Sequence, residues 1–519
     1  MFLQFESGRR GDFVVPAEWA QYVNETPSGI RVTGDRTGAR ELYLYCGPSF
    51  AAVAAGLGDL LEQLRQRDVV PKISDFAISA TLHHALVPLP FTEYEDIYFL
   101  AMGDIADIGF AEGSPTVALG HEYPWLSHRS RNDEKPSEEK LLRLLVAATE
   151  REVAEAGNDG FLMLSSGKDS PAVALALAEA GLDHIPCVTY SSGPDDPEPP
   201  VAAAICRQLG LKHEIVEMPT DPMVTSEVLA QFFETSARPG VDLSQVPYVF
   251  ATAAAGYRSG SVFDGGGNDS YMGLPVGGHD LTKLRLRLRG EKLSALARRI
   301  FPVDSPVNYL ARSRAEGVLP GRTIRLHESR AIFPHAVDTS PFWRNVSRQT
   351  SHLSLVDLFG AVTERHQGPG GSMQKQVLAA GALGMGASLP WCDHAVADYY
   401  FNLPEQDRFT RKPAKNKLLL RKMLLRYLDY DADLIGKHYF SFDGAGFILR
   451  NMDFVRSEIE SCALWDTSNL GLVRGWLDQI ESRPLLYHSL LTLFMVSGWH
   501  NHSRYLHQPS AARSRQAVA

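Results

Sequence analysis

Apolar and polar positions alternate most regularly in the middle of the chain. Short apolar runs at residues 161–164, 184–190, 213–218 and 261–263 are separated by amphipathic or alanine-rich stretches of helical length. Strands separated by helices of about 10–15 residues indicate βαβ units, in which parallel strands form one sheet with helices on both faces. This part therefore predicts an α/β fold.

The two flanks follow other patterns. Residues 1–125 contain short strand-like runs, with a helix expected at 51–66, and predict an α+β domain. Beyond about residue 281 the pattern is mostly helical, and it ends in an apolar helix at 485–500. We expect the following domains: an N-terminal α+β domain at 1–126, a linker at 127–137, a main domain at 138–507 and a disordered tail at 508–519.

Composition limits the class of protein. The 519 residues are 44% hydrophobic and carry a formal net charge of −10, which favours neither nucleic acid nor an anionic membrane as partner. The five cysteines are scattered without CxxC spacing, as is typical of a reducing compartment. No run of about 18 apolar residues occurs, so we expect a cytoplasmic protein without a membrane span.

The loop after the first central strand carries candidate chemistry. Its sequence, LSSGKDS at 164–170, combines small residues with the positive end of the following helix, a pattern that suits phosphate. Ser170 is expected to be the N-cap and Pro171 the first helical residue. Lys168 would touch phosphate, and Asp169 beside a polyphosphate needs a bridging cation such as Mg²⁺. The Walker A pattern is not met, and an ordinary βα turn remains an alternative.

Several motifs, in order, resemble one family. LSSGKDS resembles the pyrophosphate loop, S-G-G-x-D-S, of enzymes that cleave ATP between its α and β phosphates. VFDGGGNDSYMG at 262–273 resembles the S-G-E-G-S-D-E-x-F-G-G stretch of class B asparagine synthetases, β-lactam synthetases and lasso-peptide cyclases. PWCD at 390–393, NLP at 402–404 and GKHYFSFDGAGF at 436–447 resemble later motifs of the same family. The resemblance covers roughly residues 138–500.

The resemblance implies an adenine nucleotide alpha hydrolase-like fold that uses ATP and Mg²⁺. Asp169 and Asp269 would bind the metal, and Lys437 would be the catalytic lysine that steadies pyrophosphate and the adenylated intermediate. Val188, expected near the end of the second strand, would lie close to the adenine. The residues implied to contact the nucleotide are Leu164, Ser165, Ser166, Gly167, Lys168, Asp169, Ser170, Val188, Gly265 and Gly267.

The chain also departs from the family. Phe2 stands where glutamine-hydrolysing members have a cysteine, so residues 1–126 are interpreted as a degenerate glutaminase-like domain. Gly266 replaces the Glu or Tyr of the second motif, and Gly386 replaces another acidic residue. Neither glycine can accept a proton. Glutamine-derived ammonia and an aspartate substrate are therefore not expected.

These observations predict an amide synthetase of specialised metabolism that adenylates a carboxylate and lets an amine displace AMP. The expected partners are a small-molecule or peptide carboxylate and an amine, with a carrier or precursor peptide and a homodimer left open. A basic zone at 283–300 suits an acidic substrate or a solvated helix face. Two alternatives stay open: a sulfur- or nitrogen-inserting enzyme acting on RNA or a carrier protein, and a nucleotide-binding pseudoenzyme.

Overall fold

A five-stranded parallel sheet lies at the centre of the main domain. The computed structural model describes residues 2–5, 17–27, 29–273, 312–319, 323–436 and 442–507. The strand order is β11-β10-β9-β12-β13, and every neighbouring pair is parallel. This confirms the predicted α/β class. The strands are β9 (Gly160–Met163), β10 (Cys187–Ser191), β11 (His213–Glu217), β12 (Ser261–Phe263) and β13 (Gly386–Ser388).

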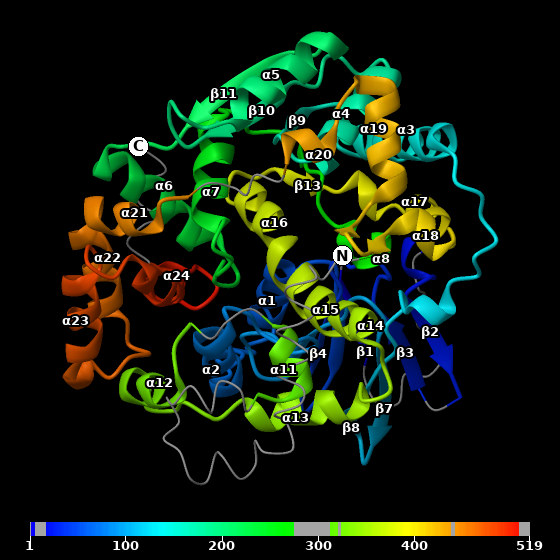
Figure 1. Ribbon diagram of the computed structural model, residues 1–519. Helices are drawn as coiled ribbons and strands as arrows, with labels where there is room; N and C mark the ends of the chain where they lie inside the picture. Colours follow the sequence, from blue (N-terminus) through cyan, green and yellow to red (C-terminus); the bar gives the residue numbers. More distant parts are fainter. Residues whose placement is uncertain are drawn as a thin grey trace, which may run out of the picture.

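Helices cover both faces of this sheet, and the strand side chains alternate between them. Phe161 and Met163 of β9 point into one hydrophobic cluster, while Leu162 and Leu164 point into another. The helices α6 and α7 (with α16) pack on the first side, and α3, α4 and α5 pack on the second (Figure 1). Their bounds are α3 (Glu138–Glu155), α4 (Asp169–Glu179), α5 (Glu198–Leu209), α6 (Pro222–Thr235), α7 (Gln245–Ala254) and α16 (Gln374–Gly381).

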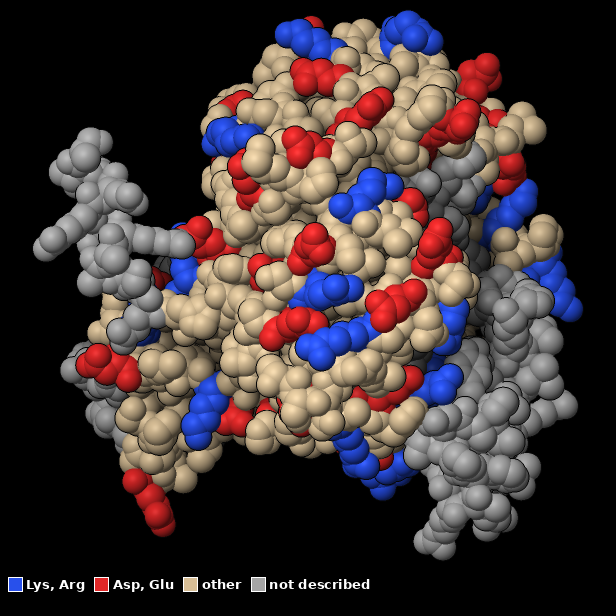
Figure 2. Space-filling model, turned by 90° about the vertical axis from the view of Figure 1, so that its left-hand side faces the viewer, with Lys and Arg blue, Asp and Glu red and all other residues tan. Residues whose placement is uncertain are grey.

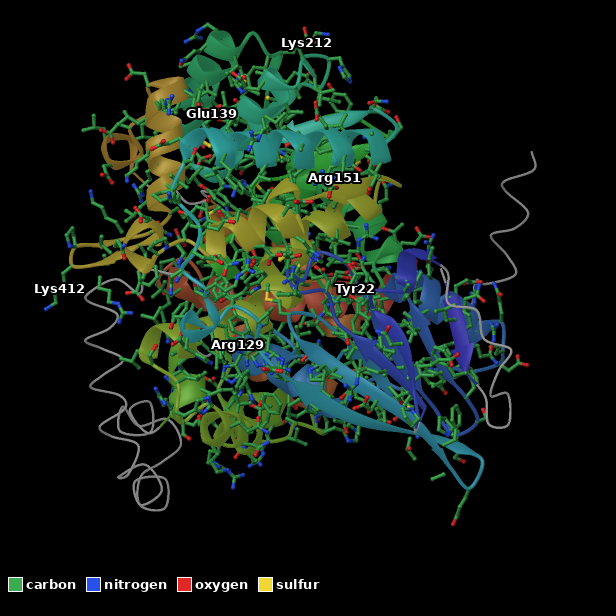
Figure 3. All side chains as sticks on the ribbon, turned by 90° about the vertical axis from the view of Figure 1, so that its right-hand side faces the viewer. Tyr22, Arg129, Glu139, Arg151, Lys212 and Lys412 are labelled. Atoms are coloured by element: carbon green, nitrogen blue, oxygen red, sulfur yellow. The ribbon has the colours of Figure 1, made fainter. Side chains whose placement is uncertain are left out.

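The N-terminal part consists of two antiparallel sheets, ordered β1-β5-β4-β6 and β2-β3-β7-β8. A separate hydrophobic cluster with Val32, Leu44 and Val53 fills the space between them. In Figure 3 these strands, marked by Tyr22, lie below α3, whose two ends are marked by Glu139 and Arg151. The elements are β1 (Phe2–Phe5), β2 (Val23–Thr26), β3 (Gly29–Thr33), β4 (Tyr43–Cys46), β5 (Ala51–Ala54), α1 (Leu57–Arg65), α2 (Asp75–His84), β6 (Ile97–Phe99), β7 (Asp104–Ala111) and β8 (Ser114–His121).

The helix predicted at 51–66 is wrong in its first third. Ala51–Ala54 forms the strand β5, which pairs with β1 on one side and β4 on the other, and all four residues are fully buried. The helix α1 begins at Leu57, after Gly56. Pairing between two neighbouring strands outweighs the helix propensity of alanine at this position.

The remainder is mostly helical, as predicted. Among the described residues no helix combines the length and the apolar character needed to cross a membrane. Residues 508–519, expected to be a tail, lie outside the described residues. The further elements are α8 (Asp269–Met272), α11 (Arg314–Val318), α12 (Leu326–Ile332), α13 (Ser340–Gln349), α14 (Leu355–Phe359), α15 (Arg365–Gln367), α17 (His394–Phe401), α18 (Glu405–Arg408), β14 (Thr410–Arg411), β15 (Ala414–Lys415), α19 (Leu418–Leu428), α20 (Ala432–Ile435), α21 (Gly444–Arg450), α22 (Met452–Ser461), α23 (Gly471–Gln479) and α24 (Tyr487–His502).

Candidate active site

The loop after β9 folds tightly at the carboxyl edge of the sheet. The Ser165 N–H donates to Ser170 Oγ at 2.9 Å, and the Gly167 N–H donates to Ser165 Oγ at 3.2 Å. The helix α4 begins at Asp169 with Lys168 as its N-cap, so the prediction of Ser170 as N-cap is wrong. The Ser170 hydroxyl turns back to the loop, and this contact replaces capping as its role.

The same loop retains unused hydrogen-bonding capacity. Ser166 is fully buried, and its Oγ has no hydrogen-bond partner within the described chain. Buried hydroxyls are almost always paired, so an unpaired one beside a helix N-terminus fits a missing anionic ligand. The phosphate contacts of this loop stay a prediction.

Glycines bring the second loop against the first. A Cβ at Gly265 would lie 2.5 Å from the Ser170 nitrogen, so the two backbones can approach this closely only without a side chain there. Gly267 has a φ of +91°, and a Cβ there would collide with Cys392 Sγ. The predicted residues Gly265 and Gly267 therefore position the start of α8 beside the start of α4.

The carboxylates of Asp169 and Asp269 meet at one ammonium group. Lys417 Nζ lies 2.8 Å from Asp169 Oδ1 and 2.8 Å from Asp269 Oδ1. It also donates to Asn268 Oδ1 at 2.6 Å, while Asn268 Nδ2 donates to Asp169 Oδ1 at 2.9 Å. Two acidic side chains from loops after different strands thus converge on a single cation.

Burial and neighbouring charges shift two lysine pKa values in opposite directions. Burial alone would lower the pKa of Lys417, but Asp169 and Asp269 outweigh it and raise that pKa above its usual value. Burial lowers the pKa of Lys168 to about 8; Asp169 opposes this, while Lys417 and Arg421 add repulsion. Lys168, Lys417 and Arg421 together provide positive charge that suits a polyanion.

The oxygen atoms at this point fit Mg²⁺, which prefers carboxylate and phosphate ligands. The described part of the chain contains no group of three or more His, Cys, Asp or Glu arranged for a metal. An ion held by Asp169 and Asp269 would therefore complete its coordination with phosphate oxygens and water. Because Lys417 Nζ lies between the two carboxylates, it would have to share them with the ion.

Two predicted nucleotide contacts lie deeper than expected. Val188 is fully buried and is the second residue of β10, so its predicted place near the end of that strand is wrong. The strand was predicted at 184–190, where Val188 would be near the end, but β10 spans Cys187–Ser191. The apolar run includes three residues that precede the strand, so the predicted start was three residues too early. Leu164 is also buried, and its N–H donates to Val188 O at 2.8 Å. Their contact with adenine stays a prediction.

The PWCD motif, residues 390–393, is hydrogen-bonded to the backbone of the loop after β9. Trp391 donates its Nε1–H to Asp169 O at 3.0 Å, and Tyr271 OH donates to Trp391 O at 2.6 Å. Asp393 caps α17 by accepting from the Ala395 N–H at 2.9 Å. These contacts fix the backbone of Asp169 and so its carboxylate.

Other predictions fall outside the described residues. Lys437 belongs to residues 437–441, and the basic zone at 283–300 belongs to residues 274–311; neither range is described. The catalytic role of Lys437 therefore stays a prediction. On the face shown in Figure 2, described acidic and basic side chains are interspersed, and that face offers no broad basic surface for a nucleic acid.

The sequence did not single out Lys417. It is the N-cap of α19 and has a left-handed φ of +54°. Lysine is disfavoured at a helix N-terminus, where its charge opposes the helix dipole. A lysine directly before the apolar helix at residues 418–428 was therefore a usable signal for a site residue.

Comparison with protein families agrees with the geometry. A family model described as asparagine synthase matches residues 140–432, more than half of the 519-residue chain. The matched range contains both loops, Asp169, Asp269 and Lys417. No curated protein matches the chain.

Proposed function

The chain belongs to the asparagine synthase family, and from that premise we propose that it is an amide synthetase that activates a substrate carboxylate with ATP. Membership assigns it to the ATP-dependent ligases that form C–N bonds. In the proposed reaction a carboxylate oxygen attacks the α-phosphorus, the bond to the β-phosphate breaks, and pyrophosphate leaves. An amine then attacks the acyl carbon, loses a proton and expels AMP.

The observation that carries this proposal is the meeting of Asp169 and Asp269 at Lys417 Nζ. Parallel sheets bind ligands at the carboxyl ends of their strands, and both aspartates follow such ends. A triphosphate there would be held by Lys168, the loop N–H groups and the α4 N-terminus. Mg²⁺ bound by the two aspartates would supply charge neutralisation at the phosphates.

The residues of this site position and neutralise charge; no side chain at 266 or 386 takes up a proton. Gly266 donates its N–H to Asp264 Oδ1 at 2.7 Å, and Gly386 pairs within the sheet. Adenylation depends on positioning and electrostatic stabilisation and does not require a base there.

We further propose that the amine does not come from glutamine and that the product is a specialised metabolite. The strand β1 reads FLQF and carries no cysteine nucleophile, which supports the first part. A carboxylate and an amine of one substrate would give ring closure, as in β-lactam formation or lasso-peptide cyclisation. The mass of the product distinguishes cyclisation from joining of two molecules.

Release of AMP and pyrophosphate tests the proposal. The full chain is incubated with ATP, Mg²⁺ and a panel of carboxylates, amines and precursor peptides, beside Asp169→Ala and the matched control Asp195→Ala. Asp195 is an exposed acidic residue in the loop after β10. We expect AMP and pyrophosphate from the unaltered chain and the control, with at least about a hundredfold loss in Asp169→Ala.

Other outcomes identify the alternatives. Formation of ADP and orthophosphate would contradict the proposal. ATP binding without pyrophosphate release across the panel would identify a nucleotide-binding pseudoenzyme. RNA binding that weakens steeply with salt would favour the sulfur- or nitrogen-inserting enzyme.

A further inference from the structure

A pocket of about 210 Å³ lies where the N-terminal sheets meet the main domain. Its walls come from five parts of the chain: residues 41 and 43 at the start of β4, residues 56–59 at the start of α1, residues 235–238 at the end of α6, the helix α16, and residues 504 and 505 after α24. Gly58 at the start of α1 approaches Tyr505, which follows α24 and closes one side. The residues of the two nucleotide loops do not line this pocket.

Three buried polar atoms around this pocket have no hydrogen-bond partner within the described chain. Arg238 gives its Nε and Nη2 hydrogens to Glu93 Oε1 at 3.1 and 3.0 Å, which leaves Nη1 unpaired. Gln374 donates its Nε2–H to Glu41 Oε1 at 2.7 Å, which leaves Oε1 unpaired. Ser236 Oγ is also unpaired.

Such groups are costly to leave unsatisfied. Ser236, Arg238 and Gln374 are 3%, 4% and 5% exposed, so bulk water reaches them poorly. Leaving a buried polar group unpaired destabilises the fold, and most proteins contain few such groups. Each of the three atoms is itself covered, so a ligand in the pocket would pair with them once their side chains rotate slightly.

The residues that line the pocket suit a ligand that carries both a negative and a positive charge. The guanidinium N–H of Arg238 and the hydroxyl of Ser236 can donate to a carboxylate, whereas Gln374 Oε1 and the Glu41 carboxylate can accept from an ammonium. Burial raises the pKa of Glu41, and a neighbouring ammonium would offset that effect. The volume exceeds the roughly 150 Å³ that admits benzene.

We propose that this pocket binds a small zwitterion, a free α-amino acid, with its carboxylate on Arg238 and Ser236 and its ammonium on Gln374 and Glu41. A simple anion would meet the Glu41 carboxylate, and a simple cation would leave Arg238 Nη1 unpaired. The site is independent of the proposed adenylation, because it shares no lining residue with the nucleotide loops.

Calorimetric titration of the full chain with each of the common L-amino acids tests this proposal, with butyrate and butylamine as probes that carry one charge each. At least one amino acid should bind at least about tenfold more tightly than either probe. Glu41→Gln should weaken that binding by about tenfold, because it removes the negative charge and keeps a hydrogen-bond acceptor.

A blocking variant gives the sharper comparison. Gly381 lines the pocket and a Cβ there meets no atom within 4 Å, so the backbone leaves room for a side chain, and the ring of Gly381→Phe is expected to occupy part of the pocket. Gly471→Phe is the matched control, because Gly471 is equally open and lies outside the pocket. We expect at least about tenfold weaker binding in Gly381→Phe and unchanged binding in Gly471→Phe. If Gly381→Phe does not fold, Gln374→Met takes its place, and its amino-acid binding is also expected to be at least about tenfold weaker.

Two results would overturn the proposal. One is that no amino acid binds more tightly than butyrate and butylamine. The other is that amino-acid binding survives in the folded blocking variant.

Discussion

Replacing Lys417 by methionine removes the ammonium from the site and keeps most of the length of the side chain. Breaking a buried ion pair by removing one partner costs about 3–5 kcal/mol. The Lys417 side chain is 2% exposed, but those of Asp169 and Asp269 are 29% and 50% exposed, so water recovers part of this loss. We therefore expect the free energy of unfolding to fall by about 2–3 kcal/mol.

Magnesium should restore the free energy of unfolding that Lys417→Met loses. In the unaltered protein the ammonium lies between the carboxylates, so Mg²⁺ without nucleotide should stabilise the fold little. In Lys417→Met the two carboxylates are left facing each other, and an ion at about 100 times its Kd restores about 2.7 kcal/mol. Urea unfolding followed by tryptophan fluorescence, with and without MgCl₂, measures both quantities.

Lys415→Met is the matched control. Lys415 pairs with Asp433 at 2.6 Å, and these side chains are 41% and 49% exposed. Exposed pairs contribute about 0–1 kcal/mol, so this variant should lose little stability and should not respond to Mg²⁺. Equal behaviour of the two variants, in stability and in magnesium response, would refute the convergence of Asp169 and Asp269.

Three further predictions follow from the same geometry. The pKa of Lys168 is about 8, so its charge is present below that pH and lost above it; affinity for a non-hydrolysable ATP analogue, measured by calorimetry, should fall as pH rises past 8, and Lys168→Met should bind weakly at every pH without this fall. Gly265→Ala would place a methyl group 2.5 Å from the Ser170 nitrogen; the loops must separate, with a loss of about 1–3 kcal/mol in urea unfolding and of analogue binding. Trp391→Phe removes the donor to Asp169 O; about 1 kcal/mol of stability should be lost, and unchanged unfolding would show that this hydrogen bond does not hold the loop.

The central sheet was predictable because its strands are short, apolar and separated by helices. Residues 161–164 and 261–263 nearly coincide with β9 and β12. The fifth strand, Gly386–Ser388, was not predicted, because three small residues carry no strand pattern and are defined only by pairing with β12. The segment at 51–54 was misassigned for the same reason: its strand is imposed by neighbours far away in the sequence.

The sequence predicted those charged site residues that lie just after a strand of the central sheet. The resemblance to the family implied that Asp169 and Asp269 bind one metal, and this agrees with the carboxyl ends of parallel strands sharing one edge of the sheet. Lys417 was missed because it reaches this edge from a helix that has no place in the βαβ pattern. The local sequence marks Lys417 as unusual at a helix N-terminus, but only tertiary packing places its ammonium at this edge of the sheet.

A crystal structure of the full chain with Mg²⁺ and a non-hydrolysable ATP analogue tests the central claim most directly. The account predicts a magnesium ion bound by oxygens of both Asp169 and Asp269, at about 2.1 Å each, and by the triphosphate. A triphosphate bound elsewhere, or a metal that contacts neither carboxylate, would contradict it.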